Sequence, residues 1–185
     1  MAEKYFISAQ ELLEDSFRLA AKVLASGFRP DFIVGVWRGG TPVGIAVQEY
    51  LQYSGIHSDH IAIRTSAYDG IELRRKDIMV HGLNYIIKKA DAENCLLIVD
   101  DVYDTGLSVK AVMDTLQGIS RRNTPRDIRT ATVYYKPGNN CSGRCPDFYI
   151  HETDKWLVFP HELQGLSREE IARHKPEIAR LIERK

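Results

Sequence analysis

The sequence has no excess of charge of either sign. Lys and Arg together number 25, and Asp and Glu also number 25, in a chain of 185 residues. Proteins that attract nucleic acid or anionic lipid through general electrostatics carry a basic excess, so neither partner is expected here. Any anionic ligand must therefore be bound by a local site.

Long apolar runs and cysteines are also scarce. No window approaches the roughly 18 uncharged apolar residues of a membrane span, and the N-terminal stretch contains acids where a signal peptide would be apolar. The 3 cysteines are too few for a disulfide framework, as is typical of proteins in a reducing compartment. We therefore expect a cytoplasmic protein that does not bind membranes.

The composition is sufficient for one domain with a substantial core, predicted to span residues 1–185, because 44% of the residues are hydrophobic. Helical and extended patterns alternate along the chain, which predicts an α/β fold with a mostly parallel sheet and helices on both faces. Helices are expected from a capping box at 8–11 up to residue 27, and at 42–53, 83–91 and 107–119. A final helix is expected after a second capping box at 167–170, with a restart at Pro176. Strands are expected at 32–36, 61–65, 77–80, 96–99, 128–135, 148–150 and 156–159.

Two adjacent acids follow the most apolar of these strands. Four consecutive apolar residues, Leu96–Val99, are typical of a strand that is buried on both faces of a parallel sheet. Asp100 and Asp101 come next, where we expect the strand to end. Ligands of open α/β sheets bind at the carboxyl ends of the strands, so these acids stand at the expected place for chemistry.

The turn after the acids has the composition of a phosphate site. Its backbone N–H groups and the start of the next helix face the same space, and Thr105 and Ser108 add hydroxyl donors. Asp100 and Asp101 would repel phosphate but suit ribose hydroxyls or a magnesium ion, so a sugar phosphate meets both demands. The plainer interpretation, in which Asp104 is an ordinary helix N-cap, leaves the double acid unexplained.

The whole stretch Leu96–Ser108 resembles the signature of type I phosphoribosyltransferases, which bind 5-phosphoribosyl 1-diphosphate (PRPP). Only Tyr103 departs from it, since an aliphatic residue is usual at that position. The resemblance implies that Asp100 and Asp101 hold the ribose hydroxyls and Mg²⁺. It implies that the 5-phosphate is bound by Asp104, Thr105, Gly106, Leu107 and Ser108.

A second stretch, Val36–Gly40, resembles the pyrophosphate-binding loop of the same family. In that loop the peptide before the basic residue is often cis, so the bond between Trp37 and Arg38 is expected to be cis. Arg38 and Gly39 would then meet the pyrophosphate, although taken alone the segment is equally consistent with a plain glycine turn. Residues 63–69, with Arg64, resemble the segment that leads into a loop closing over PRPP, and Arg64 joins the expected pyrophosphate site.

The C-terminal third is similar to the hood of the 6-oxopurine members of the family, with matches at 132–137 and 154–162. The resemblance implies a base-binding hood at about residues 136–166. In it Trp156 stacks on the purine, the main chain at Leu157 reads its edge, and Lys136 donates to O6. Taken singly, a tryptophan is more often in a core and a lysine more often solvated, so the set matters more than either residue.

The resemblance also assigns the catalytic roles. Asp104 occupies the place of an acid near N7 of the base and would act as general base. Glu162 would hold a second Mg²⁺, and Arg168 would reach pyrophosphate. The expected activity is purine salvage, with transfer of the phosphoribosyl group to N9 of hypoxanthine, guanine or xanthine by a homodimer or higher homo-oligomer.

Two other functions are compatible with the PRPP signature. One is a PRPP-binding regulator of nucleic acid, which the neutral charge disfavours because the one basic cluster, within residues 121–129, is short. The other is an enzyme for a different base such as orotate or uracil, which would lack this hood. Cys141 and Cys145 give a weak zinc signal without a second pair, and free thiols are the more typical interpretation.

Overall fold

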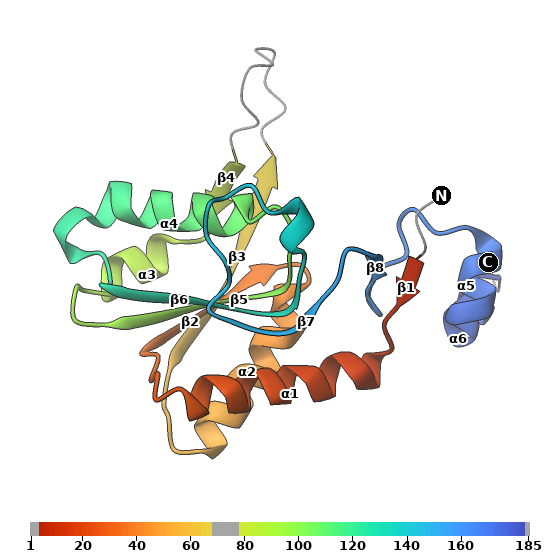
Figure 1. The fold of residues 1–185 in the computed structure, drawn as a ribbon, viewed down its shortest axis with the longest axis horizontal. Coiled ribbons are helices and arrows are strands. Elements are labelled where there is room, and N and C mark those ends of the chain that lie inside the picture. Colours follow the sequence, from red (N-terminus) through yellow and green to blue (C-terminus); the bar gives the residue numbers. More distant parts are fainter. Residues whose placement is uncertain (1–3, 68–77, 184–185) are drawn as a thin grey trace, which may run out of the picture. The chain divides into compact units, whose positions relative to one another are not determined.

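The computed structural model describes residues 4–67 and 78–183 (Figure 1). The loop expected to close over PRPP falls largely on residues 68–77, outside the described residues. The chain forms a large unit, Gln10–Asp154, and a small unit that combines Met1–Ala9 with Lys155–Lys185. The single domain predicted for residues 1–185 stays a prediction, and the hood predicted at 136–166 is divided between the two units.

A six-stranded sheet forms the centre of the large unit. Its strands are Phe32–Trp37 (β2), Asp59–Ala67 (β3), Ile78–His81 (β4), Cys95–Tyr103 (β5), Asp127–Tyr135 (β6) and Phe148–Glu152 (β7). The spatial order is β4-β3-β2-β5-β6-β7, and only β3 and β4 pair antiparallel. The mostly parallel α/β sheet predicted from the sequence is therefore confirmed.

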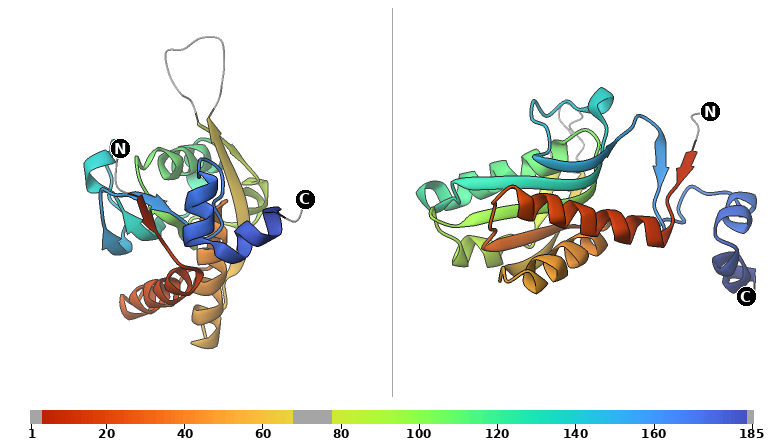
Figure 2. Two further views of the ribbon diagram at one scale, coloured as in Figure 1. Left: turned by 90° about the vertical axis from the view of Figure 1, so that its right-hand side faces the viewer. Right: turned by 60° about the horizontal axis from the view of Figure 1, so that its bottom comes forward.

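Helices cover both faces of this sheet, as Figures 1 and 2 show. One face carries α1 (Ala9–Ala25) and α2 (Gly40–Tyr53), and the other carries α3 (Asn84–Lys89) and α4 (Leu107–Ser120). Short 3-10 helices, η1 (Arg121–Asn123) and η2 (Pro137–Asn139), connect later elements. No helix within residues 4–67 and 78–183 combines the length and apolar character that a membrane span needs.

The two central strands are apolar because both of their faces are covered. Val34 and Ile98 belong to the core cluster that also contains Val112 and Leu116 of α4. Burial of a side chain of this size contributes about 1.5–3 kcal/mol, so this contiguous core holds the strand ends in place.

β5 is longer than the sequence suggests. The strand was expected to end at the acids, but it continues through Asp100 and Asp101 to Tyr103, so that expectation is wrong. The extension is held by pairing with β6, where Asp100 aligns with Thr132 and Tyr103 with Tyr135. Pairing along a neighbouring strand carries the polar residues beyond the apolar run, which local composition does not reveal.

The small unit is built from the two ends of the chain. β1 (Lys4–Phe6), which the sequence analysis missed, pairs in parallel with β8 (Trp156–Val158). The final helix is divided into α5 (Arg168–His174) and α6 (Pro176–Glu183), which confirms the restart at the proline. The second predicted capping box is also present, since Ser167 and Glu170 each bind the other's backbone N–H group.

Candidate functional site

An open pocket of about 230 Å³ lies at the carboxyl end of β5. It brings the two acids of the strand together with the turn that begins α4, as the sequence analysis expected. Its lining consists of Asp100, Asp101, Val102, Tyr103, Asp104, Thr105, Gly106, Ser108 and Val109.

The two acids at one end of this pocket are held by backbone donors. The Asp101 amide donates to Asp100 Oδ1 at 3.0 Å, and the Val102 amide donates to Asp101 Oδ1 at 2.8 Å. Burial, with the neighbouring Asp101 charge, raises the pKa of Asp100 well above its ordinary value. Two crowded carboxylates of this kind favour ligands that supply hydroxyl donors or a cation.

The loop between β2 and α2 packs directly against the acids. The peptide between Trp37 and Arg38 is cis, as the sequence analysis expected. A Cβ atom on Gly39 would overlap the Asp101 carboxylate, and one on Gly40 would lie 2.5 Å from the Val99 carbonyl oxygen. Side chains are therefore excluded from both positions, which allows the backbone to approach the acids closely.

Arg38 and Arg64, which the sequence analysis assigned to the pyrophosphate site, lie at the same edge of the sheet. Trp37 at the end of β2 is in register with Arg64 of β3, so Arg64 neighbours the loop that carries Arg38. Both arginine side chains are exposed. They are available to a ligand anion at the carboxyl edge of the strands.

At the other end of the pocket, the turn leads into a helix N-terminus. Gly106 adopts a left-handed conformation with φ of 74°, which a residue with a side chain rarely adopts. The Leu107 amide donates to Thr105 Oγ1 at 3.3 Å, which orders the first turn of α4. A helix start preceded by such a turn is a favourable place for a phosphate group.

Asp104 is paired with two residues of the segment after β6. Lys136 Nζ donates to Asp104 Oδ2 at 3.2 Å, and Asn139 Nδ2 donates to Oδ1 at 2.8 Å. The structure thus places the predicted general base beside the predicted O6 donor. Asn139 was missed by the sequence analysis, because nothing in the local sequence links it to an acid 35 positions earlier.

The remaining predicted residues belong to the small unit. The Trp156 side chain is 60% exposed, whereas Leu157 next to it is buried. Glu162 accepts the Phe159 amide at 3.0 Å through Oε2, and Arg168 is exposed at the start of α5. The residues that the large unit itself brings together are Arg38, Gly39, Arg64, Asp100, Asp101, Asp104 to Ser108, and Lys136.

The cysteines show no metal-binding arrangement. Cys141 and Cys145 are free and exposed, and Cys95 is free and partly buried. Across residues 4–67 and 78–183, no three or more His, Cys, Asp or Glu side chains are grouped so that they could hold a metal ion. The weak zinc signal of the sequence thus has no structural support in this part of the chain.

Comparisons with known proteins agree with the geometry. Residues 7–164 match the model of the phosphoribosyl transferase domain. The Bifunctional protein PyrR of Roseiflexus sp. (strain RS-1) is 24% identical over 140 residues, which cover 72% of each chain.

Solved structures give the same result. A purine phosphoribosyltransferase from Pyrococcus horikoshii Ot3 is 25% identical with a TM-score of 0.68, over 89% of this chain and 97% of that one. A xanthine-guanine-hypoxanthine phosphoribosyltransferase from Helicobacter pylori is 18% identical with a TM-score of 0.67, over 95% and 99% of the two chains. The domain match covers most of the sequence, and the chain belongs to the phosphoribosyl transferase family, with the type I fold of its structural neighbours.

Proposed function

We propose that the protein transfers the 5-phosphoribosyl group of PRPP to N9 of a 6-oxopurine and releases pyrophosphate. The observation that carries this proposal is the pocket of about 230 Å³, whose lining combines two carboxylates with a glycine turn at a helix start. A sugar phosphate presents hydroxyl donors to carboxylates and an anion to such a turn.

The acids would bind the ribose and the metal. Asp100 and Asp101 would accept hydrogen bonds from the 2′ and 3′ hydroxyls, and their oxygens are the ligands that Mg²⁺ prefers. The raised pKa of Asp100 supports this role, because a cation relieves the repulsion between the two carboxylates. When bound, Mg²⁺ would supply positive charge to the departing pyrophosphate, and Glu162 would hold a second ion.

The two phosphate groups would occupy separate parts of the site. The turn from Asp104 to Ser108 would bind the 5-phosphate through its backbone N–H groups and hydroxyls. Arg38, Gly39 and Arg64 would meet the pyrophosphate, and Arg168 of the small unit would add a further positive charge. The ring carbon at C1 becomes cationic as pyrophosphate departs. The carboxylates would favour this positive charge and the arginines would favour the departing anion, so both would lower the barrier.

The purine would be bound by Asp104, Lys136, Trp156 and Leu157, the residues that the family resemblance assigns to it. Asp104 would accept the N7 proton, and Lys136, now bound to Asp104 at 3.2 Å, would donate to O6. A cationic donor favours a carbonyl over the amino group of adenine. The exposed ring of Trp156 would stack on the base, while Leu157 would act through its main chain.

The test is an assay of the purified protein with PRPP, Mg²⁺ and each of hypoxanthine, guanine, xanthine, adenine, orotate and uracil. Nucleotide and pyrophosphate should form with one or more of the first three bases only. Conversion of orotate or uracil instead would retain the PRPP half of the proposal and reject the purine half. No conversion of any base, with no binding of PRPP, would reject both.

A PRPP-binding regulator of nucleic acid is the second candidate, since one relative is described as bifunctional. The arginines of the short basic cluster are partly neutralised, because Arg129 binds both oxygens of Asp127 and Arg126 pairs with Glu93. Binding of RNA or DNA that is specific, PRPP-dependent and retained at about 0.15 M salt would favour this candidate.

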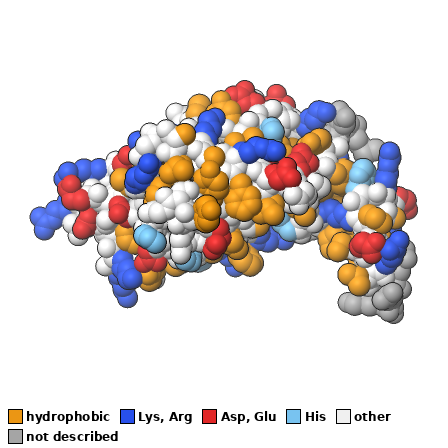
Figure 3. All heavy atoms as spheres, turned by 90° about the horizontal axis from the view of Figure 1, so that it is seen from below, with side chains coloured by type: hydrophobic (Ala, Val, Ile, Leu, Met, Phe, Trp, Pro, Cys, Tyr) orange, Lys and Arg blue, Asp and Glu red, His pale blue; other side chains and the backbone are white. Residues whose placement is uncertain are grey.

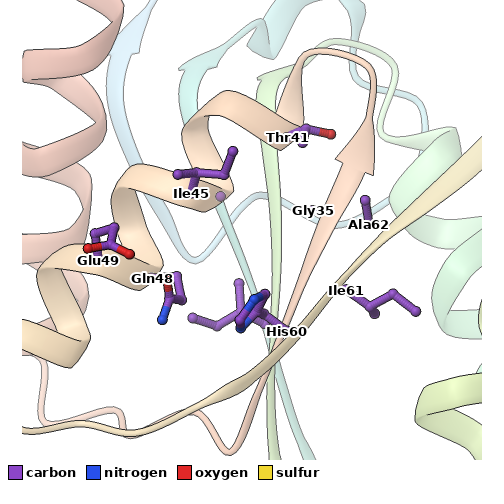
Figure 4. Close-up of a pocket in the computed structure, with 10 residues that line it drawn as sticks. Gly35, Thr41, Ile45, Gln48, Glu49, His60, Ile61 and Ala62 are labelled. Carbon is purple, nitrogen blue, oxygen red and sulfur yellow. The ribbon is translucent and has the colours of Figure 1, made fainter.

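We also propose that the enzyme is a cytoplasmic homodimer. A second pocket, of about 300 Å³, lies between α2 and the strands β2 and β3, lined by Thr41, Ile45, Gln48 and His60 among others (Figure 4). Ile45 is 60% exposed, and hydrophobic side chains gather on the face seen from below (Figure 3). A partner at this face would adjoin the loop that precedes α2.

The oligomeric state can be measured directly. Light scattering at micromolar concentration should give twice the chain mass, and Ile45→Glu should give the single mass because a charge would be buried in the contact. Lys110→Glu, at an exposed position of α4, is the matched control and should leave the mass unchanged. A monomeric parent protein would contradict the proposal.

A further inference from the structure

The segment after β6 contacts four consecutive residues, Tyr103–Gly106, which form the end of β5 and the start of the candidate phosphate turn. Tyr103 accepts the Lys136 amide at 2.9 Å through its carbonyl, and Asp104 accepts Asn139 Nδ2 at 2.8 Å. The Thr105 carbonyl accepts the Cys141 amide at 3.1 Å. Together these bonds hold the outer side of the turn.

Gly106, the fourth residue, shows how closely this segment is packed. A Cβ atom there would lie 2.5 Å from both Ser142 Oγ and Tyr103 Cε1. Contacts this short would force the segment away from the turn. The position therefore requires glycine for space as well as for its positive φ.

The Tyr103 hydroxyl is the centre of this packing. Its oxygen lies 2.9 Å from Ser142 Oγ, and it donates to the Arg144 carbonyl at 3.2 Å. Ser142 lies against Asn140 Oδ1, which accepts the Ser142 amide at 3.1 Å and is 2.9 Å from Ser142 Oγ. Tyr103 is 3% exposed, so solvent competes little for these bonds.

Tyr103 is also the one departure from the phosphoribosyltransferase signature in this stretch. An aliphatic side chain at this position would fill the space beneath the turn but could not bind the segment 140–144. The Tyr103 ring and the segment 140–144 are thus joined by hydrogen bonds that need the tyrosine hydroxyl.

We propose that Tyr103 is a positioning residue for the 5-phosphate, acting through Ser142 and the segment 140–144. The backbone N–H groups of Thr105 and Gly106 point at a phosphate only if their peptide planes are fixed, and the hydroxyl fixes them before the ligand arrives. When the turn is already ordered, the free energy of ligand binding is not reduced by the entropic cost of ordering it. This inference rests on the proposed PRPP-dependent function.

The test compares Tyr103→Phe and Ser142→Ala with the parent enzyme. Each variant should raise the KM for PRPP about 3–10-fold, since each loses the part-buried Tyr103–Ser142 contact, with kcat and the KM for the base within about twofold. The Kd for ribose 5-phosphate should rise by the same factor, whereas the Kd for pyrophosphate should not change. The double variant should lose less than the sum of the two single losses, because both single variants remove the Tyr103–Ser142 bond.

Tyr149→Phe is the matched control, since it removes an exposed hydroxyl that donates to Glu152 Oε1 at 2.6 Å elsewhere in the same unit. It should leave every constant unchanged. Should Tyr103→Phe fail to fold, Ser142→Ala carries the same expectation with the ring intact. Equal losses of affinity for ribose 5-phosphate and pyrophosphate, or no loss of affinity for either, would overturn the inference. The proposed function would still stand if the parent enzyme is active.

Discussion

The two halves of the proposed site are built in different ways. The phosphoribosyl half comes from a contiguous stretch, Leu96–Ser108, in which strand, acids, turn and helix start follow one another directly. The proposed base half includes the small unit, which joins residues from opposite ends of the chain. A site made by one strand and its turn can be recognised from local sequence, whereas a site assembled from both termini cannot.

Contacts within the small unit illustrate the difference. Lys4 Nζ binds Glu170 Oε1 at 2.7 Å across 166 positions, and the rings of Phe6 and His174 stack with centroids 3.7 Å apart. No periodicity or spacing rule connects such residues. The candidate phosphate turn, in contrast, is recognisable because the proposed binding of phosphate requires a glycine and hydroxyls at fixed neighbouring positions.

The largest expected effect falls on the contiguous half. Asp100→Asn combined with Asp101→Asn should lower kcat/KM for PRPP about 10³-fold, because two charged acceptors are lost and each is worth about 1.5–3 kcal/mol. The circular dichroism spectrum should be unchanged, since both side chains face the pocket. A double variant as active as the parent would show that the signature does not bind ribose here.

A smaller effect is expected at the proposed general base. Asp104→Asn should lower kcat about 10²-fold, since an amide cannot take the N7 proton. The Kd for PRPP, measured by calorimetry, should change little because Thr105 to Ser108 still form the turn. Loss of PRPP affinity equal to the loss of kcat would mean that Asp104 binds phosphate and does not act on the base.

The sequence predicted most elements of both units, but not the pairing of β1 with β8 that joins the two ends of the chain. The alternation of elements gave the parallel sheet, and Asp100, Asp101 and Asp104 line one pocket as expected. The end of β5 was predicted too early because pairing with β6, rather than composition, extends the strand. Asn139 and β1 were missed because their partners are distant in sequence.

Lys175 provides a third prediction, now within the small unit. Its ammonium donates to the carbonyls of Phe159, Pro160 and Glu162 at 2.8, 2.9 and 2.6 Å, which fixes the turn that follows β8. Lys175→Met removes these three bonds and should raise the KM for the base about 3–10-fold by loosening the neighbouring Trp156. The KM for PRPP, from the same steady-state assays, should change less than twofold.

Arg180→Met is the control for Lys175→Met. It removes an exposed ion pair of the same small unit, with Glu177. If both variants raised the KM for the base equally, the effect would come from general loosening of the unit. If neither did, this turn would have no part in base binding.

The smallest expected effect is on the thermal stability of the protein, and it concerns Asp100 of the acid pair. The pKa of Asp100 is raised in the folded protein by burial and by Asp101. Between the ordinary pKa of about 3.9 and the raised value, the folded state keeps a proton that the unfolded state has released, so stability falls as the pH rises through this window. Asp100→Asn does not titrate and should melt higher than the ligand-free parent at pH 7.

The gain should shrink as the pH is lowered toward about 4, where the parent carboxyl is protonated as well. Each kcal/mol gained corresponds to roughly 2–4 °C in Tm for a chain of this size, which scanning calorimetry resolves. Gln117→Ala, at an exposed position of α4 that does not titrate, is the control and should give the same Tm difference at both pH values. A variant that melts below the parent at pH 7 would mean that the Asp100 carboxylate is stabilised in the free protein, and crowding of the two acids would then not support the proposed binding of a cation.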